Sequence, residues 1–303
     1  MLLKKILKNR VNQLFIRLIS LIFLIPYIFK VKKLKLNILD AENTIKFIQN
    51  NRISIGRFGD GEFNIIFKNK SIGFQIKSSN LQNELSNIKE NSNFKIAIPH
   101  ALESTRDYKL LIKTFWWRYV VFNFSNLEMF CKSHDNFFLD TNFSRIITEF
   151  KDKKEINRLI GETCKIWKDR NIVIVEGEYT RFGVGNDLLK EANTVSRIIA
   201  PSQNAYSKIN EIYNETINIV RELEDPLILI SLGPAATCLA YRFSSSCQAI
   251  DIGHFDLQYQ YLQNGYYHKV KVDNRYDNEM INGDKVKKIK DSIYLSEIKA
   301  IVK

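Results

Sequence analysis

Cysteine is scarce in this chain: four cysteines occur among 303 residues, and none forms a Cys-x-x-Cys pair. This spacing excludes a scaffold built on disulfides and offers no ligand pattern for zinc, so we expect reduced thiols in a reducing compartment. Low-complexity linkers and internal repeats are also missing, while 45% of the residues are hydrophobic. A chain of this length and composition can fill one large core, so the sequence predicts a globular protein.

Acidic side chains are missing from residues 1–37, which contain nine lysines and arginines. The remaining residues, 38–303, carry 36 basic and 33 acidic side chains, a formal net charge of +3. A nearly neutral body argues against a basic groove for nucleic acid across the fold. A basic tail instead favours contact with an anionic lipid surface.

No apolar run is long enough to cross a bilayer as a regular helix. Residues 14–29 form an apolar segment that contains Arg17 and Pro26 and is flanked by lysines, but a spanning helix needs about 20 residues. A signal peptide is a competing interpretation, although no small-residue cleavage site follows. We expect residues 1–37 to associate with the inner face of the cell membrane, which makes the protein cytoplasmic and peripheral. A hydrophobic helix packed on the domain or on a partner subunit is the alternative.

Short apolar runs alternate with amphipathic helical patterns, the first of which is capped by Asp40. The apolar runs are residues 53–55, 95–99, 172–175, 197–201, 227–230 and 248–252. Strands of this kind that alternate with helices indicate a parallel sheet covered on both faces. The sequence thus predicts the α/β class: one Rossmann-like domain over residues 38–303, with a mostly parallel sheet and helices on both faces.

Polar side chains and glycines follow these predicted strands where they end. Because ligands bind beyond the carboxyl ends of parallel strands, we expect these residues to meet at one edge of the sheet. They are Arg57, Asp60, Glu62, Glu176, Glu178, Arg181, Asn204, Ser231, Gly233, Asp251 and His254. The turn at Gly233 also begins a predicted helix, whose free N–H groups favour an anion such as a diphosphate.

The stretch 52–62 combines glycines, a guanidinium group and two carboxylates at the end of the first predicted strand. Its glycines, Gly59 among them, permit a tight turn or close contact of the backbone with a ligand. If Asp60 to Glu62 continue the extended conformation, the two carboxylates lie on the same side about 6–7 Å apart and can share one divalent cation. The alternative is a glycine turn whose acidic side chains are only solvated.

The sequence resembles the GT-D type glycosyltransferases, a bacterial family with a Rossmann-like fold, from about residue 50 to about residue 280. The resemblance rests on an ordered series of motifs: Arg57-Phe-Gly-Asp-Gly-Glu62, Val175-Glu-Gly-Glu-Tyr-Thr-Arg181 with Gly183-Val-Gly-Asn-Asp187, Ala200-Pro-Ser-Gln-Asn-Ala205, Leu232-Gly-Pro-Ala-Ala-Thr237 with Leu239-Ala240, and Asp251-Ile-Gly-His254. Residues 1–37 and the lysine-rich end lie outside it.

The resemblance implies transfer of a sugar, expected to be a hexose, from a nucleotide-sugar donor to a surface glycan, glycolipid or glycoprotein acceptor. It implies a UDP-sugar as donor and a divalent metal, Mn²⁺ or Mg²⁺, at the Asp-x-Glu motif formed here by Asp60 and Glu62. The chain departs from the family pattern at Gln258, where an acidic residue would precede Tyr259. This departure puts a catalytic role at position 258 in doubt.

The departure of a nucleoside diphosphate needs positive charge and N–H donors where its negative charge develops. We therefore assign Asp60 and Glu62 to the metal, with His254 as the candidate third ligand. An inverting transfer also needs a base, for which both Glu178 and Asp251 are candidates. In the alternative interpretation, Glu178 pairs with Arg181 and Asp251 supports a turn. The residues assigned to the donor are Arg57, Gly59, Arg181, Asn204 and Gly233.

Two competing functions use the same residues. A metal-dependent phosphohydrolase needs the same acids and the same anion-binding turn, and a non-catalytic membrane-associated protein could bind nucleotide or glycan there. We place acceptor recognition in the basic end 268–303 and in the aromatic-rich region 105–150, which is predicted to be largely helical. Within that region, Trp116 and Trp117 are expected in the core rather than stacked on a sugar.

Overall fold

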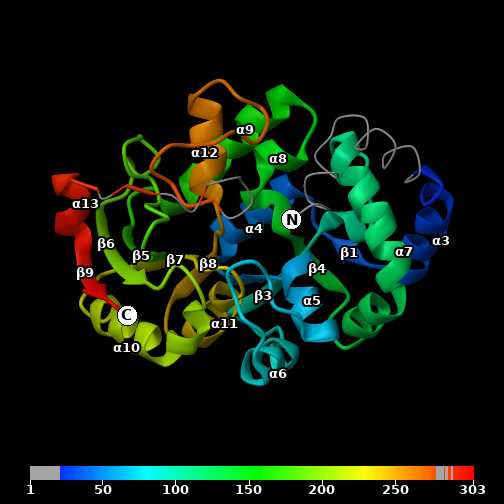
Figure 1. Cartoon of the computed structure of the whole chain (residues 1–303), viewed down its shortest axis with the longest axis horizontal. Helices are drawn as coiled ribbons and strands as arrows, with labels where there is room; N and C mark the ends of the chain where they lie inside the picture. The colour runs from blue at the N-terminus through cyan, green and yellow to red at the C-terminus, as the bar shows by residue number, and fades with distance from the viewer. Residues whose placement is uncertain (1–20, 278–282, 284–285, 288) are drawn as a thin grey trace.

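The computed structural model describes residues 21–277, 283, 286–287 and 289–303 (Figure 1). In this part of the chain, nine strands form one sheet in the order β1-β4-β3-β2-β8-β7-β5-β6-β9, and every neighbouring pair is parallel. The strands are β1 (Asn37–Ile38), β2 (Ser54–Arg57), β3 (Phe94–Ile98), β4 (Phe137–Asp140), β5 (Asn171–Gly177), β6 (Thr194–Ala200), β7 (Pro226–Ser231), β8 (Gln248–Asp251) and β9 (Ile298–Ile301).

Helices cover both faces of the sheet, and two hydrophobic cores lie between them and the strands (Figure 1). Their bounds are α3 (Leu24–Leu34), α4 (Ala41–Asn51), α5 (Asp60–Lys68), α6 (Ser79–Asn87), α7 (Leu110–Lys132), α8 (Ile146–Glu149), α9 (Lys153–Cys164), α10 (Ile209–Val220), α11 (Pro234–Phe243), α12 (Phe255–Gln263) and α13 (Ser292–Glu297). Two 3₁₀ helices near the site are η2 (Thr141–Ser144) and η4 (Ala205–Lys208).

The central strands β5 and β7 contain continuous apolar runs because each contributes to both cores. In β5, Val173 and Val175 pack into the core under α10 and α11, whereas Ile172 and Ile174 pack into the opposite one. Successive side chains of a strand point to opposite faces, so a strand covered on both faces needs a continuous apolar run. The predicted α/β class with a parallel, doubly covered sheet is confirmed.

The helix that follows Asp40 is also confirmed, because the Asp40 carboxylate accepts a hydrogen bond from the N–H of Asn43 at 2.8 Å and caps α4. The region 105–150 is helical for much of its length, as expected, through α7, η2 and α8, but the strand β4 lies between α7 and η2. The aromatic side chains of Phe137 and Phe138 belong to a strand.

The N-terminal part of the described chain forms α3, which packs along α7 at one end of the molecule (Figure 1). Tyr27 and Val31 are buried, and the Tyr27 hydroxyl donates to the carbonyl of Ala101 at 2.8 Å. Helix α3 therefore packs on the domain, as the alternative interpretation predicted. Residues 1–20, including much of the apolar segment 14–29, lie outside the described residues. Among the described helices, none combines the length and hydrophobicity of a membrane span.

Candidate functional site

A cavity of about 480 Å³ lies at the carboxyl edge of the sheet, which is the size range of small-molecule sites. We call it the chamber. Polar residues from the strand ends line one part of it, and aromatic residues of α7 line another. Its lining residues are Arg57, Gly59, Asp60, Gly61, Glu62, Asn64, Ile72, Gly73, Phe74, Pro99, Ile112, Phe115, Trp116, Thr141, Asn142, Arg145, Glu149, Ser231, Gly233, Gly253 and His254. Asp60, Gly233 and His254, which are distant in sequence, thus meet at one cavity.

Arg57 is the last residue of β2, and its side chain is held at the chamber by two partners. The guanidinium group donates to the Ser144 hydroxyl at 2.9 Å and to the Asp251 carboxylate at 2.9 Å. It lies against Gly253, where any Cβ would overlap the guanidinium atoms. The glycine of the Asp251-Ile-Gly-His254 motif therefore makes room for Arg57 as well as supplying a positive φ of 54°.

Asp60 and Glu62 do not continue the strand, so the prediction of two carboxylates on one side of an extended segment was wrong. They occupy the first turn of α5, where residues two apart point in different directions. The Glu62 carboxylate turns back and accepts the N–H of Gly59 at 2.9 Å, forming a capping box. Burial, and next the Asp251 charge, raise the pKa of Glu62 to about 7.

The donor set for a metal is therefore only partly formed. Asp60, Glu62 and His254 line the same chamber, but within the described residues no group of three or more His, Cys, Asp or Glu side chains is placed to hold one metal ion. Asp60 is exposed at the chamber wall, while the Glu62 carboxylate is engaged in the cap. The predicted three-residue metal site is not preformed. A carboxylate at Asp60 fits a divalent ion that takes its other ligands from elsewhere.

His254 lies at the chamber in a strongly basic neighbourhood. Burial, and the charges of Arg145 and Arg57, lower the pKa of its imidazole to about 4, although the Asp277 carboxylate opposes them. The ring is therefore neutral at physiological pH, and its buried Nδ1 has no hydrogen-bond partner among the described residues. A neutral ring within reach of the charges of two guanidinium groups suits a site that receives an anion.

Gly233 caps α11 with a φ of 55° and a ψ of −139°, a conformation that glycine tolerates and other residues avoid. The α11 N-terminus faces the cavities, as the anion-site prediction requires, but the ring of Phe74 packs directly against it. Phe74 also borders a second, much smaller cavity of about 30 Å³, which we call the slot. Its other lining residues are Gln75, Gly177, Thr180, Pro201, Ser202, Asn204, Ala205, Ser231, Leu232, Gly233, His254 and Tyr276.

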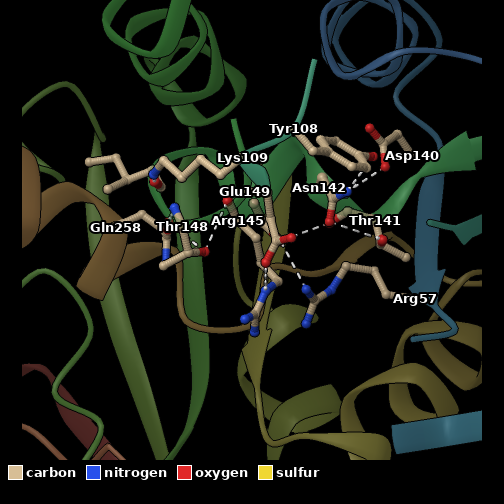
Figure 2. A network of polar contacts seen from close by, with 12 residues as sticks. Arg57, Tyr108, Lys109, Asp140, Thr141, Asn142, Arg145, Thr148, Glu149 and Gln258 are labelled. Carbon is tan, nitrogen blue, oxygen red and sulfur yellow. Dashed lines mark hydrogen bonds and ion pairs between the residues drawn. The ribbon is translucent and has the colours of Figure 1, made fainter. Parts of the chain in front are cut away.

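The segment after β4 supplies chamber residues that the sequence predictions missed. Arg145 and Glu149 line the chamber and form an ion pair at 3.3 Å (Figure 2). Asn142 lines it too, with its amide donating to the Tyr108 hydroxyl at 2.6 Å (Figure 2). The signal was present, because the apolar run 137–139 passes into Asp-Thr-Asn, the same change from apolar to polar seen at other strand ends. High aromatic content concealed it.

Gln258 helps to hold this segment. Its side-chain oxygen accepts the N–H of Thr148 at 3.0 Å, one residue before Glu149 (Figure 2). Gln258 itself is buried in α12 and does not line the chamber. The residue at which the chain departs from the family pattern thus supports the chamber wall without facing the ligand space.

Four predicted site residues lie elsewhere or are already engaged. Glu178 is exposed and lines neither cavity, and Arg181 is buried with its guanidinium on the carbonyls of Asn274 and Lys287. Asn204 lines the slot, but its side-chain oxygen accepts from Gln75 at 2.6 Å. Asp251 is 2% exposed, and both its oxygens are bound, one by Arg57 and the other by Thr237 at 3.1 Å. These contacts favour supporting roles for Arg181 and Asp251.

The two adjacent tryptophans have different surroundings. Trp117 is buried and donates to the Thr105 hydroxyl at 3.0 Å, as expected of a core residue. Trp116 is 6% exposed, packs edge-on against Phe115, and with Phe115 lines the chamber. The chamber therefore has an apolar wall in addition to its charged strand ends.

Comparison with known proteins points to one family. The family model described as "GT-D: Glycosyltransferase GT-D fold" matches residues 55–280. The chain is 30% identical over 263 residues to a protein of Streptococcus pneumoniae serotype 4 named "Glycosyltransferase GlyD", covering 86% of the chain and 32% of that protein. It is 30% identical over 271 residues to the "Probable glycosyl transferase Gly" of Streptococcus gordonii, covering 88% and 39%. The chain thus spans about a third of the length of these curated relatives.

Two solved structures are similar over most of the chain. One, described as "The highly conserved domain of unknown function 1792 has a distinct glycosyltransferase fold", has a TM-score of 0.83 at 28% identity and covers 91% of this chain and 99% of that one. The other, "A New Glycosyltransferase (DUF1792) from Streptococcus sanguinis", has a TM-score of 0.81 at 29% identity and covers 88% and 100%.

Proposed function

Because the chain belongs to the glycosyltransferase GT-D fold family, we propose that it transfers a hexose from a UDP-sugar to a glycan acceptor. The observation that carries the proposal is the chamber, where two guanidinium groups, a helix N-terminus and an exposed carboxylate surround a cavity with an aromatic wall. Charged groups of this kind suit a diphosphate, and aromatic side chains suit the apolar face of a sugar. A sugar nucleotide presents both.

Arg57 and Arg145 are assigned to the diphosphate. Negative charge develops on the departing nucleoside diphosphate, and fixed guanidinium groups stabilise it without reorganising at the moment of reaction. The Asp251 and Ser144 contacts hold Arg57 in place, and the pair with Glu149 holds Arg145. Glu149 is thus a positioning residue. Gly59 contributes through its place in the α5 cap beside Asp60.

A divalent metal, Mn²⁺ or Mg²⁺, is proposed to accompany the donor. Asp60 would hold it at the chamber wall, with the diphosphate and water supplying further ligands, and Glu62 could join by releasing the Gly59 N–H. When bound, such an ion neutralises diphosphate charge. Because the described residues preform no three-ligand group, we expect Mn²⁺ alone to bind weakly and Mn²⁺ with UDP to raise the melting temperature.

Transferase activity can be tested by incubating the protein with UDP-sugars, Mn²⁺ and a panel of glycan acceptors, and by measuring UDP release and lengthened glycan. We expect Arg145→Gln to lower kcat/KM by about 10- to 100-fold, because one charge-assisted contact to the diphosphate is lost. Arg118→Gln is the matched control, since Arg118 is exposed on α7 and lines neither cavity.

Two results would contradict the proposal. Release of inorganic phosphate from nucleotides without any acceptor would indicate a phosphohydrolase. If no UDP-sugar raises the melting temperature, either with or without Mn²⁺, the chamber is not a binding site for this donor. The Asp60→Asn/Glu62→Gln double variant should lose metal-dependent transfer while remaining folded.

The membrane association expected from the sequence is likewise proposed. The outward face of α3 carries exposed apolar side chains, with Ile25 66% and Phe29 72% exposed, and Ile22, just before the helix, is 66% exposed. The basic residues 1–20 come shortly before it in the sequence. Apolar burial combined with lysines is the pattern of a helix that lies on an anionic bilayer. We therefore propose that this end of the protein contacts the inner face of the cell membrane.

A further inference from the structure

The chamber and the slot are neighbours that share four lining residues: Phe74, Ser231, Gly233 and His254. Three of these belong to the ends of β7 and β8 or to the start of α11, whereas Phe74 comes from the loop between α5 and α6. Its ring lies so close to Gly233 that any Cβ there would overlap it. Phe74 therefore stands between the two cavities and covers the α11 N-terminus.

Two buried polar atoms at this junction lack a partner among the described residues. They are the hydroxyl of Ser231, a residue 4% exposed, and Nδ1 of His254. Buried polar groups are nearly always hydrogen-bonded, because an unsatisfied one costs roughly 1–3 kcal/mol. Both atoms belong to residues that line both cavities. A ligand bound at the junction would supply the missing partners.

From these features we infer that Ser231, His254 and the α11 N-terminus form the phosphate subsite of the donor, that Phe74 blocks it in the ligand-free protein, and that the nucleoside extends into the slot. This inference rests on the proposed function, because it gives the orientation of the sugar-nucleotide donor that the proposed function requires. The sugar then occupies the chamber beside Asp60 and the aromatic wall of Phe115 and Trp116.

The size of the slot requires Phe74 to move. A space of about 30 Å³ holds little more than a water molecule, so a nucleobase fits only when the ring leaves and the slot joins the chamber. The loop that carries the ring is anchored at Phe74 itself and at the residue that follows it. The carbonyl of Phe74 accepts the N–H of Asn204 at 2.7 Å, and the Gln75 amide donates to Asn204 at 2.6 Å. The side chain can therefore swing while the loop stays attached to the slot.

The slot also has the position expected of a nucleoside site. It is formed by the ends of β5, β6 and β7 through Gly177, Ser202 and Ser231, and ligands of parallel sheets lie beyond the carboxyl ends of the strands. At Gly177 an added Cβ would approach the backbone of Ser202 within 3.2 Å, so a side chain there would crowd the wall of the slot. The chamber, by contrast, provides Arg57 and Arg145 for the diphosphate and the aromatic wall for the sugar.

The inference is tested by calorimetric binding of UDP and of pyrophosphate, each with Mn²⁺. If Phe74 blocks the subsite, Phe74→Ala should tighten UDP binding at least about threefold, because a competent conformation that was rarely populated becomes dominant. Ser231→Ala should lower the affinity for both UDP and pyrophosphate about tenfold, which is the effect of losing one hydrogen bond to a charged group. Ser202→Phe fills the slot and should abolish UDP binding while pyrophosphate still binds.

Ile76→Ala is the matched control, since Ile76 is exposed in the same loop as Phe74 and lines neither cavity, and UDP affinity should stay within twofold of the parent protein. Unchanged UDP affinity in both Phe74→Ala and Ser231→Ala would overturn the inference. So would equal loss of UDP and pyrophosphate binding in Ser202→Phe, with circular dichroism showing the native fold. If the parent protein binds neither UDP nor any UDP-sugar, the proposed function fails instead, so the two failures are distinguishable.

Discussion

At the scale of single residues, Asp251 shows how a side chain that looks catalytic in a sequence can act through a neighbour. It lies at the end of β8, beneath Arg57, and its two oxygens are bound by Arg57 and Thr237. A carboxylate that is 2% exposed and engaged on both oxygens does not face the chamber. Its contribution to transfer is the orientation of a guanidinium group.

Asp251→Asn separates positioning from base catalysis. The amide can still accept from Arg57 through its oxygen and donate to the Thr237 hydroxyl, which also donates to the Arg57 carbonyl at 2.9 Å. We therefore expect a folded variant whose kcat/KM falls by less than about tenfold, with an unchanged pH profile. If Asp251 were the general base, kcat/KM of the variant would fall by about 10²–10⁴-fold, and the acidic limb of its pH profile would disappear. Measuring kcat/KM for sugar transfer from pH 5 to pH 9 decides between them.

At the scale of elements, the start of α11 shows why a strand-to-helix turn needs glycine at one position. Gly233 combines a positive φ with the close approach of the Phe74 ring. The φ and ψ values lie in a region that costs other residues about 1–3 kcal/mol, and the overlap with the ring adds to that cost. Two independent effects therefore require glycine here.

Gly233→Ala should lower the free energy of unfolding by about 2–4 kcal/mol, as measured by urea denaturation. Adding Phe74→Ala should recover the free energy lost to the overlap with the ring but not the free energy lost to the strained backbone. The effects of the two substitutions on the free energy of unfolding will therefore not be additive. Gly161→Ala is the control: Gly161 lies within α9 with no atom within 4 Å of an added Cβ, and alanine there should stabilise by about 0.5–1 kcal/mol. Equal effects at both positions would contradict this account of Gly233.

At the scale of the whole molecule, the exposed apolar side chains are concentrated at opposite ends of the sheet. One group lies on α3 and the adjoining α7, where Phe122 is 69% and Met129 62% exposed, and lysines accompany it. The other lies on α13, at the far end of the molecule (Figure 1). The two ends can therefore be compared directly in a membrane-binding experiment.

Ile25→Glu/Phe29→Glu should abolish cosedimentation of the full chain with vesicles that contain phosphatidylserine, because both apolar burial and charge attraction are lost. Ile293→Glu/Leu295→Glu also changes two exposed apolar side chains, here on α13, and this variant should bind like the parent protein. If the parent protein bound neutral and anionic vesicles equally well, the lysines would not contribute to membrane binding. Retention of the α3 variant on anionic vesicles would refute the membrane-facing assignment.

The sequence by itself determined the class of fold and the edge where the site lies. Apolar runs such as 172–175 and 227–230 have one physical solution, a parallel strand buried on both faces, and the carboxyl ends of parallel strands share an edge. That reasoning brought Arg57, Asp60, Gly233 and His254 to the chamber. It did not detect β1, which has only two residues, or β9 in the lysine-rich end, and the high aromatic content of 105–150 concealed β4.

Only the tertiary structure decided what each polar side chain does, because a side chain's partner is set by elements far away in the sequence. Asp60 and Glu62 belong to a helix because Gly59 and the Glu62 carboxylate cap it, and Arg181 is occupied by carbonyls about a hundred residues later. Arg145 became a site residue through the path of the chain after β4. Local periodicity reveals which residues reach an edge, whereas three-dimensional packing determines which of them stay free to meet a ligand.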